Sequence, residues 1–492
     1  MKNIIFPVPT LLCTSLMILL MIFQVNAQDV PSQQQVLDKM LLANSYFMNI
    51  WTDPGADIIT DRARPSNIWT RATYYEGLMA LYTIDPRQEY YDYAVQWGES
   101  HNWAPAYNRP TRNADNQACG QTYIDLYLID PKPERVAPIK QSIDQMVNSG
   151  QSDDWWWIDA LQMSMPVFAR LGVVYADNKY FEKMFDLYNF TKTSHGDSGL
   201  YNRVDHLWWR DADFDPPYRE PNGEDCYWSR GDGWVFTALA RVLDVLPEDA
   251  PHRDEYITTF KEMAEALLAV QRTDGFWNVS LHDPNNFGGK ELTGTGFFTY
   301  GMAWGINNGL LSEEEYKPAV INAWNGMAND ALHPNGFLGY VQGTGKEPSS
   351  SQPVTYTSVP NFEDFGLGAF LLAGSEVYKL IDETTAVGDA TASHSVSIPA
   401  QFMLHPAHPN PFNSETTITY ILAEESAISL AVYDSLGHRV HTILQNARQS
   451  VGEHKVSWRG VDDEGQQAAS GIYIVRLQIG QKIKTQKITL IR

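Results

Sequence analysis

The sequence has few cysteines, only 3 in 492 residues. A small fold held together by disulfides, or a zinc site built from thiolates, requires more than this number. Cys13 lies in a segment that we predict to be removed, so the mature chain keeps Cys119 and Cys226. We expect both to be packed free thiols, and a disulfide between them is the alternative.

Positive charge is also scarce, with 36 lysines and arginines against 59 aspartates and glutamates, and a net charge of -23 at pH 7. Such an acidic surface repels nucleic acids and anionic membranes. It also disfavours a groove for a long polyanion. A small acidic sugar, held by one or two local cations, remains compatible with this composition.

Motifs for metals and cofactors are missing too. The 12 histidines are scattered rather than placed at ligand spacing. No glycine-rich loop that could cradle a phosphate occurs. We therefore expect neither a metal ion nor a cofactor, and any chemistry has to come from the side chains of the chain itself.

The amino terminus carries a short apolar run, residues 11–23, after a single charge at Lys2. Small residues at 25–27 follow the run, which is typical of a secretory signal peptide and its cleavage site. The run is too short for a membrane span. We predict a signal peptide over residues 1–27 and an exported mature chain without a membrane-spanning segment.

A pair of helices recurs six times between about residues 34 and 382. The first helix of each pair is amphipathic, as in 253–271, where apolar residues follow one stripe. The amphipathic helices are expected to begin near Gln34, Arg87, Pro133, Asn178, Arg253 and Ser312. The second helix is rich in small and aromatic residues, which indicates burial on all sides. These helices are expected to begin near Trp69, Asp115, Trp155, Trp228, Leu292 and Glu363.

Six buried helices inside six amphipathic ones is the arrangement of an (α/α)6 barrel, which we predict for residues 28–382. An open helical solenoid is the alternative, but no capping repeat is evident at either end. Polar and aromatic residues gather where the buried helices begin. The loops that lead into these helices, including the long loop 194–227, are expected to build one pocket at one end of the ring.

The composition changes after the last helix. Residues 383–397 are rich in Thr, Ala, Gly and Ser and are predicted to be a linker. Residues 398–492 contain short alternating segments separated by turn residues, namely 416–422, 427–433, 454–458, 471–477 and 482–491. These predict a small all-β sandwich. No acids, bases or metal ligands cluster there, so we expect no catalytic role.

Two aromatic segments point to chemistry. In 155–159 three tryptophans precede Asp159, and in 227–234 aromatic residues bracket Arg230. Aromatic rings offer stacking faces to a sugar, and an arginine binds a carboxylate in bidentate fashion. Asp159, placed more than one turn inside a helix beside Trp155, Trp156 and Met163, is a candidate proton donor in apolar surroundings. The alternative is that the tryptophans are core residues and the charges cap helices.

Four segments carry a family resemblance: DNQACGQTY (115–123), WIDALQM (157–163), HLWWRD (206–211) and WSRGDGW (228–234). They resemble the unsaturated uronyl hydrolases, specifically the unsaturated rhamnogalacturonyl hydrolases of glycoside hydrolase family 105, with family 88 as a sister family. The resemblance implies that Asp159 is the general acid and base and that Asp115 is a second carboxylate of the site.

The same resemblance implies that His206, Arg230 and Trp234 line the sugar pocket. Trp228 and Trp156, from the two aromatic segments, are further candidates for binding the substrate. One position departs from the family, which has Asn where this chain has Asp232. A carboxylate there would repel an acidic substrate unless Asp232 turns away to cap the helix.

The tail resembles the sorting domain of the type IX secretion pathway, with its flagellar-hook-like immunoglobulin fold. The matching segments are HPNPFN (408–413), VYDSLG (432–437) and SGIY (470–473). The resemblance implies that the secretion machinery is a partner. It also implies export through the periplasm, followed by release or attachment at the cell surface.

The predicted function is hydration of unsaturated uronides. Polysaccharide lyases leave a C4=C5 double bond at the non-reducing end of their products. Protonation of C4 and addition of water at C5 give a hemiketal that collapses and frees the sugar, and one carboxyl group can serve both steps. The expected substrates are oligosaccharides of rhamnogalacturonan or ulvan type that carry an unsaturated uronic acid.

Two other readings stay open. One is a polysaccharide lyase or an inverting glycosidase on the same barrel, although a lyase needs a basic groove for its polyanion. The other is a non-catalytic glycan-binding surface protein, for which exposed tryptophans and one arginine would suffice.

Overall fold

The computed structural model describes most of the helical part and most of the tail. The described residues are 30–196, 198–359, 364–381, 403–404, 407, 410, 412–422, 425–434, 438–480 and 482–491. The predicted signal peptide and the predicted linker lie outside these residues. None of the described helices combines the length and the apolar character that a membrane crossing requires.

The predicted amphipathic helices are all present in the described chain. They are α1 (Gln33–Ile50), α3 (Gln88–Ser100), α6 (Ala137–Val147), α8 (Lys179–Thr193), α10 (Arg253–Ala269) and α12 (Glu313–Gly326). Each buries one stripe and exposes the other face, as the 3.6-residue period predicts.

The predicted buried helices are present as well. They are α2 (Trp69–Ile84), α4 (Ala114–Gln117) with α5 (Gly120–Ile129), α7 (Asp159–Tyr175), α9 (Ser229–Leu243), α11 (Leu292–Asn307) and α13 (Asp364–Leu380). Every residue of α9 is buried, and so is every residue of α11 up to Ile306. Short helical turns η1 (Ala106–Asn108), η2 (Pro133–Arg135) and η3 (Met327–Ala331) and a small hairpin, β1 (Ile58–Ile59) and β2 (Ala63–Arg64), complete this part.

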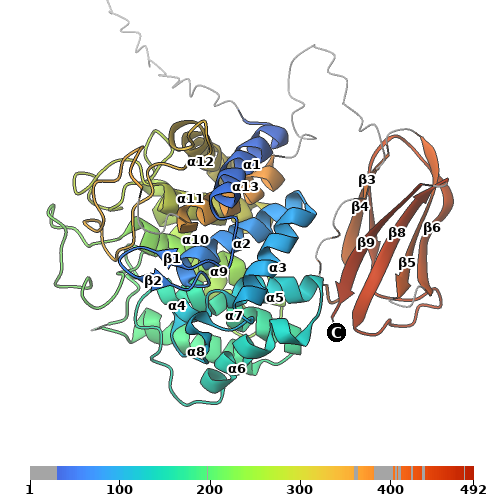
Figure 1. The fold of residues 1–492 in the computed structure, drawn as a ribbon, viewed down its shortest axis with the longest axis horizontal. Helices are drawn as coiled ribbons and strands as arrows, with labels where there is room; N and C mark the ends of the chain where they lie inside the picture. Colours follow the sequence, from blue (N-terminus) through green and yellow to red (C-terminus); the bar gives the residue numbers. More distant parts are fainter. Residues whose placement is uncertain are drawn as a thin grey trace, which may run out of the picture.

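The buried helices contact one another in a closed series. α2 contacts α5, which contacts α7, and the series continues through α9, α11 and α13 back to α2. In Figure 1 the last helix, α13, lies beside the first two, α1 and α2, although they are far apart in the sequence. The amphipathic helices pack against this series, for example α8 on α7 and α12 on α11.

The contact between α2 and α13 depends on two glycines and an ion pair. A Cβ on Gly368 would lie 2.2 Å from the carbonyl oxygen of Thr73, and one on Gly77 would lie 2.7 Å from that of Gly368. Arg71 Nε and Asp364 Oδ2 are 2.9 Å apart, and both side chains are buried. The first and last buried helices are therefore joined by backbone contact and by charge.

The tail forms two antiparallel sheets. One sheet has the order β3 (Met403–Leu404), β4 (Thr416–Leu422), β7 (Gly452–Trp458). The other has the order β6 (Arg439–Gln449), β5 (Ser426–Asp434), β8 (Gly471–Ile479), β9 (Lys482–Leu490). Alternate residues of β4 are buried, and Phe412, Trp458 and Tyr473 belong to one core. The predicted all-β tail is confirmed, but the short strand β3 and strand β6 were missed.

Candidate active site

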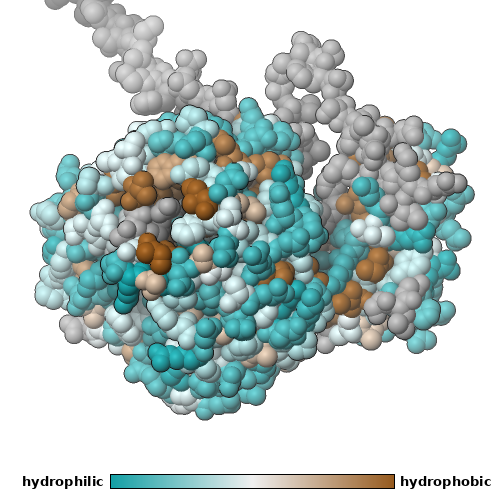
Figure 2. Space-filling view, in the orientation of Figure 1, coloured by the Kyte–Doolittle hydropathy of each residue, from teal (hydrophilic) through white to brown (hydrophobic). Residues whose placement is uncertain are grey.

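The starts of the buried helices are hydrogen-bonded to the loops that lead into the neighbouring buried helices. Three backbone hydrogen bonds make this pattern: Ile158 N to Arg210 O at 3.0 Å, Ser229 N to Val279 O at 2.9 Å, and Leu292 N to Tyr340 O at 2.8 Å. Each bond joins the start of one buried helix to the loop that leads into the next. On the face drawn in Figure 2, apolar side chains gather over the loops that Figure 1 draws at the left.

Asp159 is the first residue of α7, with Ile158 as its N-cap. The prediction that it lies more than one turn inside the helix, on one face with Trp155 and Trp156, is therefore wrong. The tryptophans lie in the preceding loop, because that loop is tied to other segments: Thr191 Oγ1 donates to the carbonyl of Trp155 at 2.5 Å. The dipole at a helix start favours the ionised form of a carboxyl group. Burial therefore has to outweigh the helix dipole if Asp159 is to hold a proton.

The carboxyl group of Asp159 is largely buried, with 14% of the side chain exposed. Its Oδ2 atom is 3.2 Å from Arg210 Nη2. Its Oδ1 atom is buried and has no hydrogen-bond partner within the described part of the chain. Burial raises the pKa of Asp159, against the opposing charges of Arg210 and Arg230. Burial thus favours the protonated form, and no described group competes for Oδ1.

Asp115 lies beside Asp159, as predicted. It is in the first turn of α4, which packs against α7. Burial, and then the charge of Asp159, raise the pKa of Asp115 to about 7. Two carboxyl groups that repel each other tend to share one proton near neutral pH, which is a property of catalytic pairs.

Arg210 is a residue of this site that the sequence analysis did not single out. Its Nη1 atom is 2.5 Å from Asp211 Oδ2, and its Nη2 atom faces Asp159. Its Nε atom is buried without a hydrogen-bond partner among the described residues. Arg210 stands in the quoted segment HLWWRD, and a lone cation between a tryptophan and an aspartate was the signal that could have found it.

Arg230 does not have the arrangement predicted for it. The guanidinium is buried, and it donates from Nη1 to Gln342 O at 2.5 Å and from Nη2 to Gly343 O at 2.8 Å. The rings of Trp228 and Phe365 flank it at 4.6 and 4.8 Å. Burial lowers the pKa of Arg230 to about 10. Its side chain holds the 342–343 loop, so both terminal nitrogens are already engaged by backbone carbonyls.

Asp232 turns away from the helix start, but it does not cap its own helix. Its Oδ1 atom accepts a hydrogen bond from the backbone N–H of Trp208 at 2.8 Å, and the side chain is fully buried. Burial raises the pKa of Asp232 well above its usual range. A neutral Asp232 adds no negative charge to the site, and its role is to hold the loop that carries Arg210.

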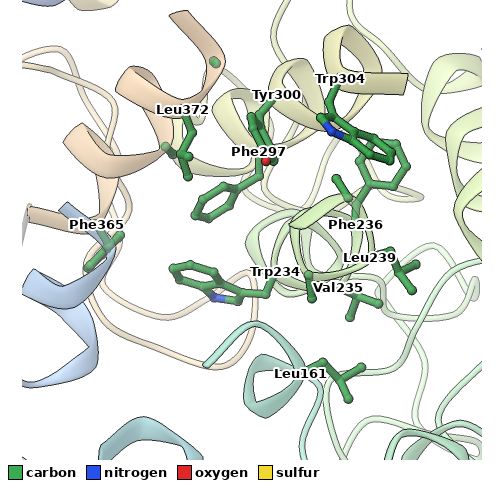
Figure 3. Packing of buried hydrophobic residues seen from close by; sticks show 14 of the residues in the cluster. Leu161, Trp234, Val235, Phe236, Leu239, Phe297, Tyr300, Trp304, Phe365 and Leu372 are labelled. Atoms are coloured by element: carbon green, nitrogen blue, oxygen red, sulfur yellow. The ribbon is translucent and has the colours of Figure 1, made fainter. Parts of the chain in front are cut away.

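The aromatic residues divide into two groups. Trp228 and Trp234 are 2% and 1% exposed, so the expectation that they offer open stacking faces is wrong for both. Trp228 Nε1 donates to Gln342 Oε1 at 2.8 Å. Figure 3 shows Trp234 in the packed interior beside Phe297, with the two ring centroids 4.4 Å apart. Trp156 is 49% exposed and lies against Trp157, so it keeps a face for a sugar.

His206 lies in the loop before α9, with its ring stacked at 6.3 Å from that of Tyr201. Its backbone N–H donates to Asn202 O at 2.8 Å, and its φ is +56°. Nothing described links the ring to Asp115 or Asp159, so its role in the pocket stays a prediction. Cys119 and Cys226 are free and buried, which confirms the expectation of two packed thiols.

The described residues contain no group of three or more His, Cys, Asp or Glu side chains that could hold a metal ion. The chemistry that the site itself offers is proton transfer by a carboxyl pair beside two guanidinium groups. Arg210, with 15% of its side chain exposed, is the cation that a ligand could meet, and Oδ1 of Asp159 is the buried carboxyl oxygen without a described partner.

Comparison with known families gives two matches. The model of Glycosyl Hydrolase Family 88 matches residues 42–381, and that of the FlgD Ig-like domain matches residues 412–481. Family 88 is the one that the sequence analysis named as a sister family. A structure described as family 105, from C. acetobutylicum, shares the fold at 21% identity and a TM-score of 0.56.

Two curated relatives carry the same description, "Unsaturated 3S-rhamnoglycuronyl hydrolase". The one from Formosa agariphila is 35% identical over 332 residues, which cover 63% of this chain and 84% of the relative. The one from an Alteromonas strain is 32% identical over 340 residues, which cover 64% of this chain and 79% of the relative.

Two solved structures are similar at comparable identity. "Glycosyl hydrolase family 88 from Bacteroides vulgatus" is 34% identical with a TM-score of 0.65, covering 71% of this chain and 100% of that one. A structure described as a polysaccharide lyase is 33% identical with a TM-score of 0.64, covering 70% of this chain and 97% of that one.

Proposed function

Because this chain belongs to glycosyl hydrolase family 88, we propose that it is a hydrolase that removes a 4,5-unsaturated uronic acid from the non-reducing end of oligosaccharides. The observation that carries the proposal is the pair of Asp115 and Asp159, two carboxyl groups with raised pKa values in one site. The names of the two curated relatives support an unsaturated uronide next to a rhamnose. We therefore favour substrates of rhamnogalacturonan or ulvan type.

The reaction uses the double bond rather than the anomeric carbon. Asp159 transfers its proton to C4 of the enol ether, and the positive charge that forms at C5 is shared with the ring oxygen. A water molecule then adds at C5 as the Asp159 carboxylate takes its proton back. The hemiketal opens to a ketone at C5, and the ring oxygen becomes a hydroxyl group on C1. The hemiacetal at C1 then collapses to an aldehyde, its bond to the glycosidic oxygen breaks, and the rest of the oligosaccharide leaves with the hydroxyl proton.

Burial of the carboxyl pair supports this mechanism. An ordinary aspartic acid is ionised at neutral pH and has no proton to give. Burial of Asp159 raises its pKa, and Oδ1 has no competing partner among the residues that the structure describes. A single group that acts first as acid and then as base completes both steps, so a double displacement at the anomeric carbon is not needed. We propose Asp159 as that group and Asp115 as the carboxyl that keeps the pair partly protonated.

The architecture and the location of the protein are part of the proposal. The closed series of contacts from α2 to α13 supports an (α/α)6 barrel over residues 28–382. We propose that residues 398–492 are a secretion sorting domain, in keeping with the FlgD Ig-like match. Together with the signal peptide proposed for residues 1–27, this makes the enzyme secreted or attached to the cell surface.

A polysaccharide lyase is the second candidate, because a structure with that description is 33% identical. The two activities change the same signal in opposite directions. A lyase creates the double bond, so the ultraviolet absorbance of intact polymer rises. The hydrolase consumes the double bond, so the absorbance of lyase-treated polymer falls.

The test is a panel of oligosaccharides prepared with lyases from rhamnogalacturonan, ulvan and a glycosaminoglycan, each offered to the full-length enzyme. We expect absorbance to fall with the rhamnose-containing substrates, and mass spectrometry to show loss of one uronate unit. A rise with intact polymer, or no change with any member of the panel, would contradict the proposal.

A further inference from the structure

The two arginines near Asp159 differ in what they can bind. The guanidinium of Arg230 is 1% exposed, and both terminal nitrogens already donate to carbonyls of the 342–343 loop. Arg210 has 15% of its side chain exposed. A substrate anion that needs a cation therefore meets Arg210 before it meets Arg230.

The contacts of Arg210 leave one edge of its guanidinium without a full set of hydrogen-bond partners. Nη1 is held by Asp211 at 2.5 Å, and Asp211 is in turn fixed by the backbone N–H of Asp213 at 2.9 Å. On the other edge Nε is buried without a described partner, and Nη2 makes a longer contact of 3.2 Å to Asp159. The guanidinium is thus anchored on one side and weakly engaged on the other.

The Nε and Nη2 edge is the one that arginine uses to bind a carboxylate side-on with two parallel hydrogen bonds. Two other arginines of this chain bind carboxylates through the same edge. Arg272 binds Asp274 through Nε at 3.0 Å and Nη2 at 2.9 Å, and Arg112 binds Asp154 through the same two nitrogens. At Arg210 the described residues fill only half of this arrangement.

We propose that Arg210 binds the carboxylate of the uronate through Nε and Nη2, and that Asp159 leaves its ion pair when this happens. The inference rests on the proposed function, since it takes a uronate as the ligand. It makes Arg210 a substrate-binding residue that also controls the acid, because the substrate takes the cation that faces Asp159.

The replacement of Asp159 by the substrate carboxylate at Arg210 would favour protonation of Asp159 when the substrate binds. Burial and the charge of Asp211 favour the protonated form of Asp159, while Arg210 and Arg230 favour the ionised carboxylate. A bound uronate both occupies Arg210 and brings a negative charge beside Asp159. Each change favours the protonated acid, so substrate binding and protonation are coupled.

A purely structural role for Arg210 makes a different prediction. Its carbonyl accepts from Ile158 N at 3.0 Å, so the residue also holds the start of α7 to its loop. Loss of that support would lower activity on every substrate by the same factor. Loss of a carboxylate contact would lower activity only on substrates that carry the charge.

The experiment compares kcat/KM for an unsaturated uronide and for its methyl ester. The enzymes are the wild type, Arg210→Gln, Arg210→Lys, Arg230→Gln and the control Arg272→Gln. We expect the acid-over-ester preference of the wild type to fall at least about tenfold in Arg210→Gln, the scale of one charged hydrogen-bond pair. Arg210→Lys should keep part of the preference, and Arg230→Gln and Arg272→Gln should keep all of it.

An unchanged preference in Arg210→Gln, or its loss in Arg230→Gln instead, would overturn the inference. If Arg210→Gln does not fold, as judged by circular dichroism, Arg210→Lys decides the outcome. A reduced acid-over-ester preference in Arg210→Lys supports the inference, and an unchanged preference overturns it. Calorimetry with saturated glucuronic acid keeps the test independent of turnover. Binding at least about tenfold weaker in the Arg210 variant supports the inference, and equal binding overturns it even if the wild type proves inactive on every unsaturated substrate.

Discussion

Asp115 lies close enough to Asp159 for the charge of Asp159 to raise its pKa. The two residues are 44 positions apart in a sequence where each begins or nearly begins a buried helix, α4 and α7. Neither helix alone would place two carboxyl groups together. The contact between helix starts creates the pair, and the pair is the basis of the chemistry.

Replacing Asp159 by Asn should keep the fold and remove nearly all activity, because an amide has no proton to give to C4. General acid and base catalysis contributes roughly 10²–10⁴-fold, so turnover should fall by at least that factor. Loss of double-bond absorbance measures it, and circular dichroism checks the fold. A variant that keeps more than about a tenth of the activity contradicts the assigned role.

Replacing Asp115 by Asn should move the alkaline limb of the pH profile to lower pH. A carboxyl group raised from 3.8 to about 7 keeps the proton of the pair available near neutral pH, and the amide does not repel Asp159. The profile of kcat/KM against pH for wild type and variant is the measurement. An unchanged alkaline limb would mean that the two carboxyl groups are not coupled.

The same group makes a prediction about stability. Because the folded-state pKa of Asp115 is raised, its contribution to stability is full below 3.8 and is lost as pH rises to about 7. The advantage of Asp115→Asn in melting temperature should therefore grow from pH 4 to pH 8. An advantage that is constant over this range would contradict the raised pKa.

Asp232→Asn should be close to wild type in activity, since a buried neutral carboxyl and an amide present the same acceptor to Trp208 N. Burial raises the folded-state pKa of Asp232, so its contribution to stability is lost as pH rises, and the amide should be stabilising at neutral pH. Asp232→Ala removes the acceptor and should cost about 1–3 kcal/mol. Thermal unfolding and kcat/KM of both variants distinguish these outcomes.

Gly368→Ala should destabilise the helical domain by about 2–3 kcal/mol, because a Cβ would lie 2.2 Å from the carbonyl oxygen of Thr73. Gly150→Ala is the matched control, since its Cβ would meet nothing within 4 Å and should change the free energy of unfolding by less than about 0.5 kcal/mol. Denaturant unfolding compares them. Equal stability of the two variants would mean that α2 and α13 can move apart without loss.

Cys119 and Cys226 should resist alkylation in the native protein. Both are buried, and burial raises the pKa of Cys119 to about 12 and also raises that of Cys226. The thiolate that reacts is therefore hardly populated at neutral pH. Mass spectrometry after iodoacetamide treatment should find both thiols labelled only in denaturant, and a native protein that labels rapidly would contradict this.

Sequence patterns predicted the helices because their causes are local. The 3.6-residue stripe in 253–271 identified α10, observed as Arg253–Ala269. Strand β6 was missed because none of its residues is fully buried, so no two-residue alternation marks it. The periodicity of hydrophobic residues predicts a helix or a strand only where one face of that element is buried.

The candidate site was predicted in part. Asp115 and Asp159 were identified and do lie together. The start of α7 was misplaced because the apolar segment 155–158 resembles helix, while its partner, the carbonyl of Arg210, is 52 positions from Ile158 and leaves no local trace. Arg210 was missed for the same reason, since its importance depends on what it faces in space.

The junction of α2 and α13 sets the order in which the protein can be completed. Arg71 emerges early from the ribosome, and its partner Asp364 follows nearly three hundred positions later. Until then the first buried helix has an unmatched charge and an uncovered flank, and contacts this distant in sequence are slow to form. A nascent or truncated chain that stops short of Asp364 would thus be a target for chaperones and proteases, while the tail, made last, reaches the exit only when closure has become possible.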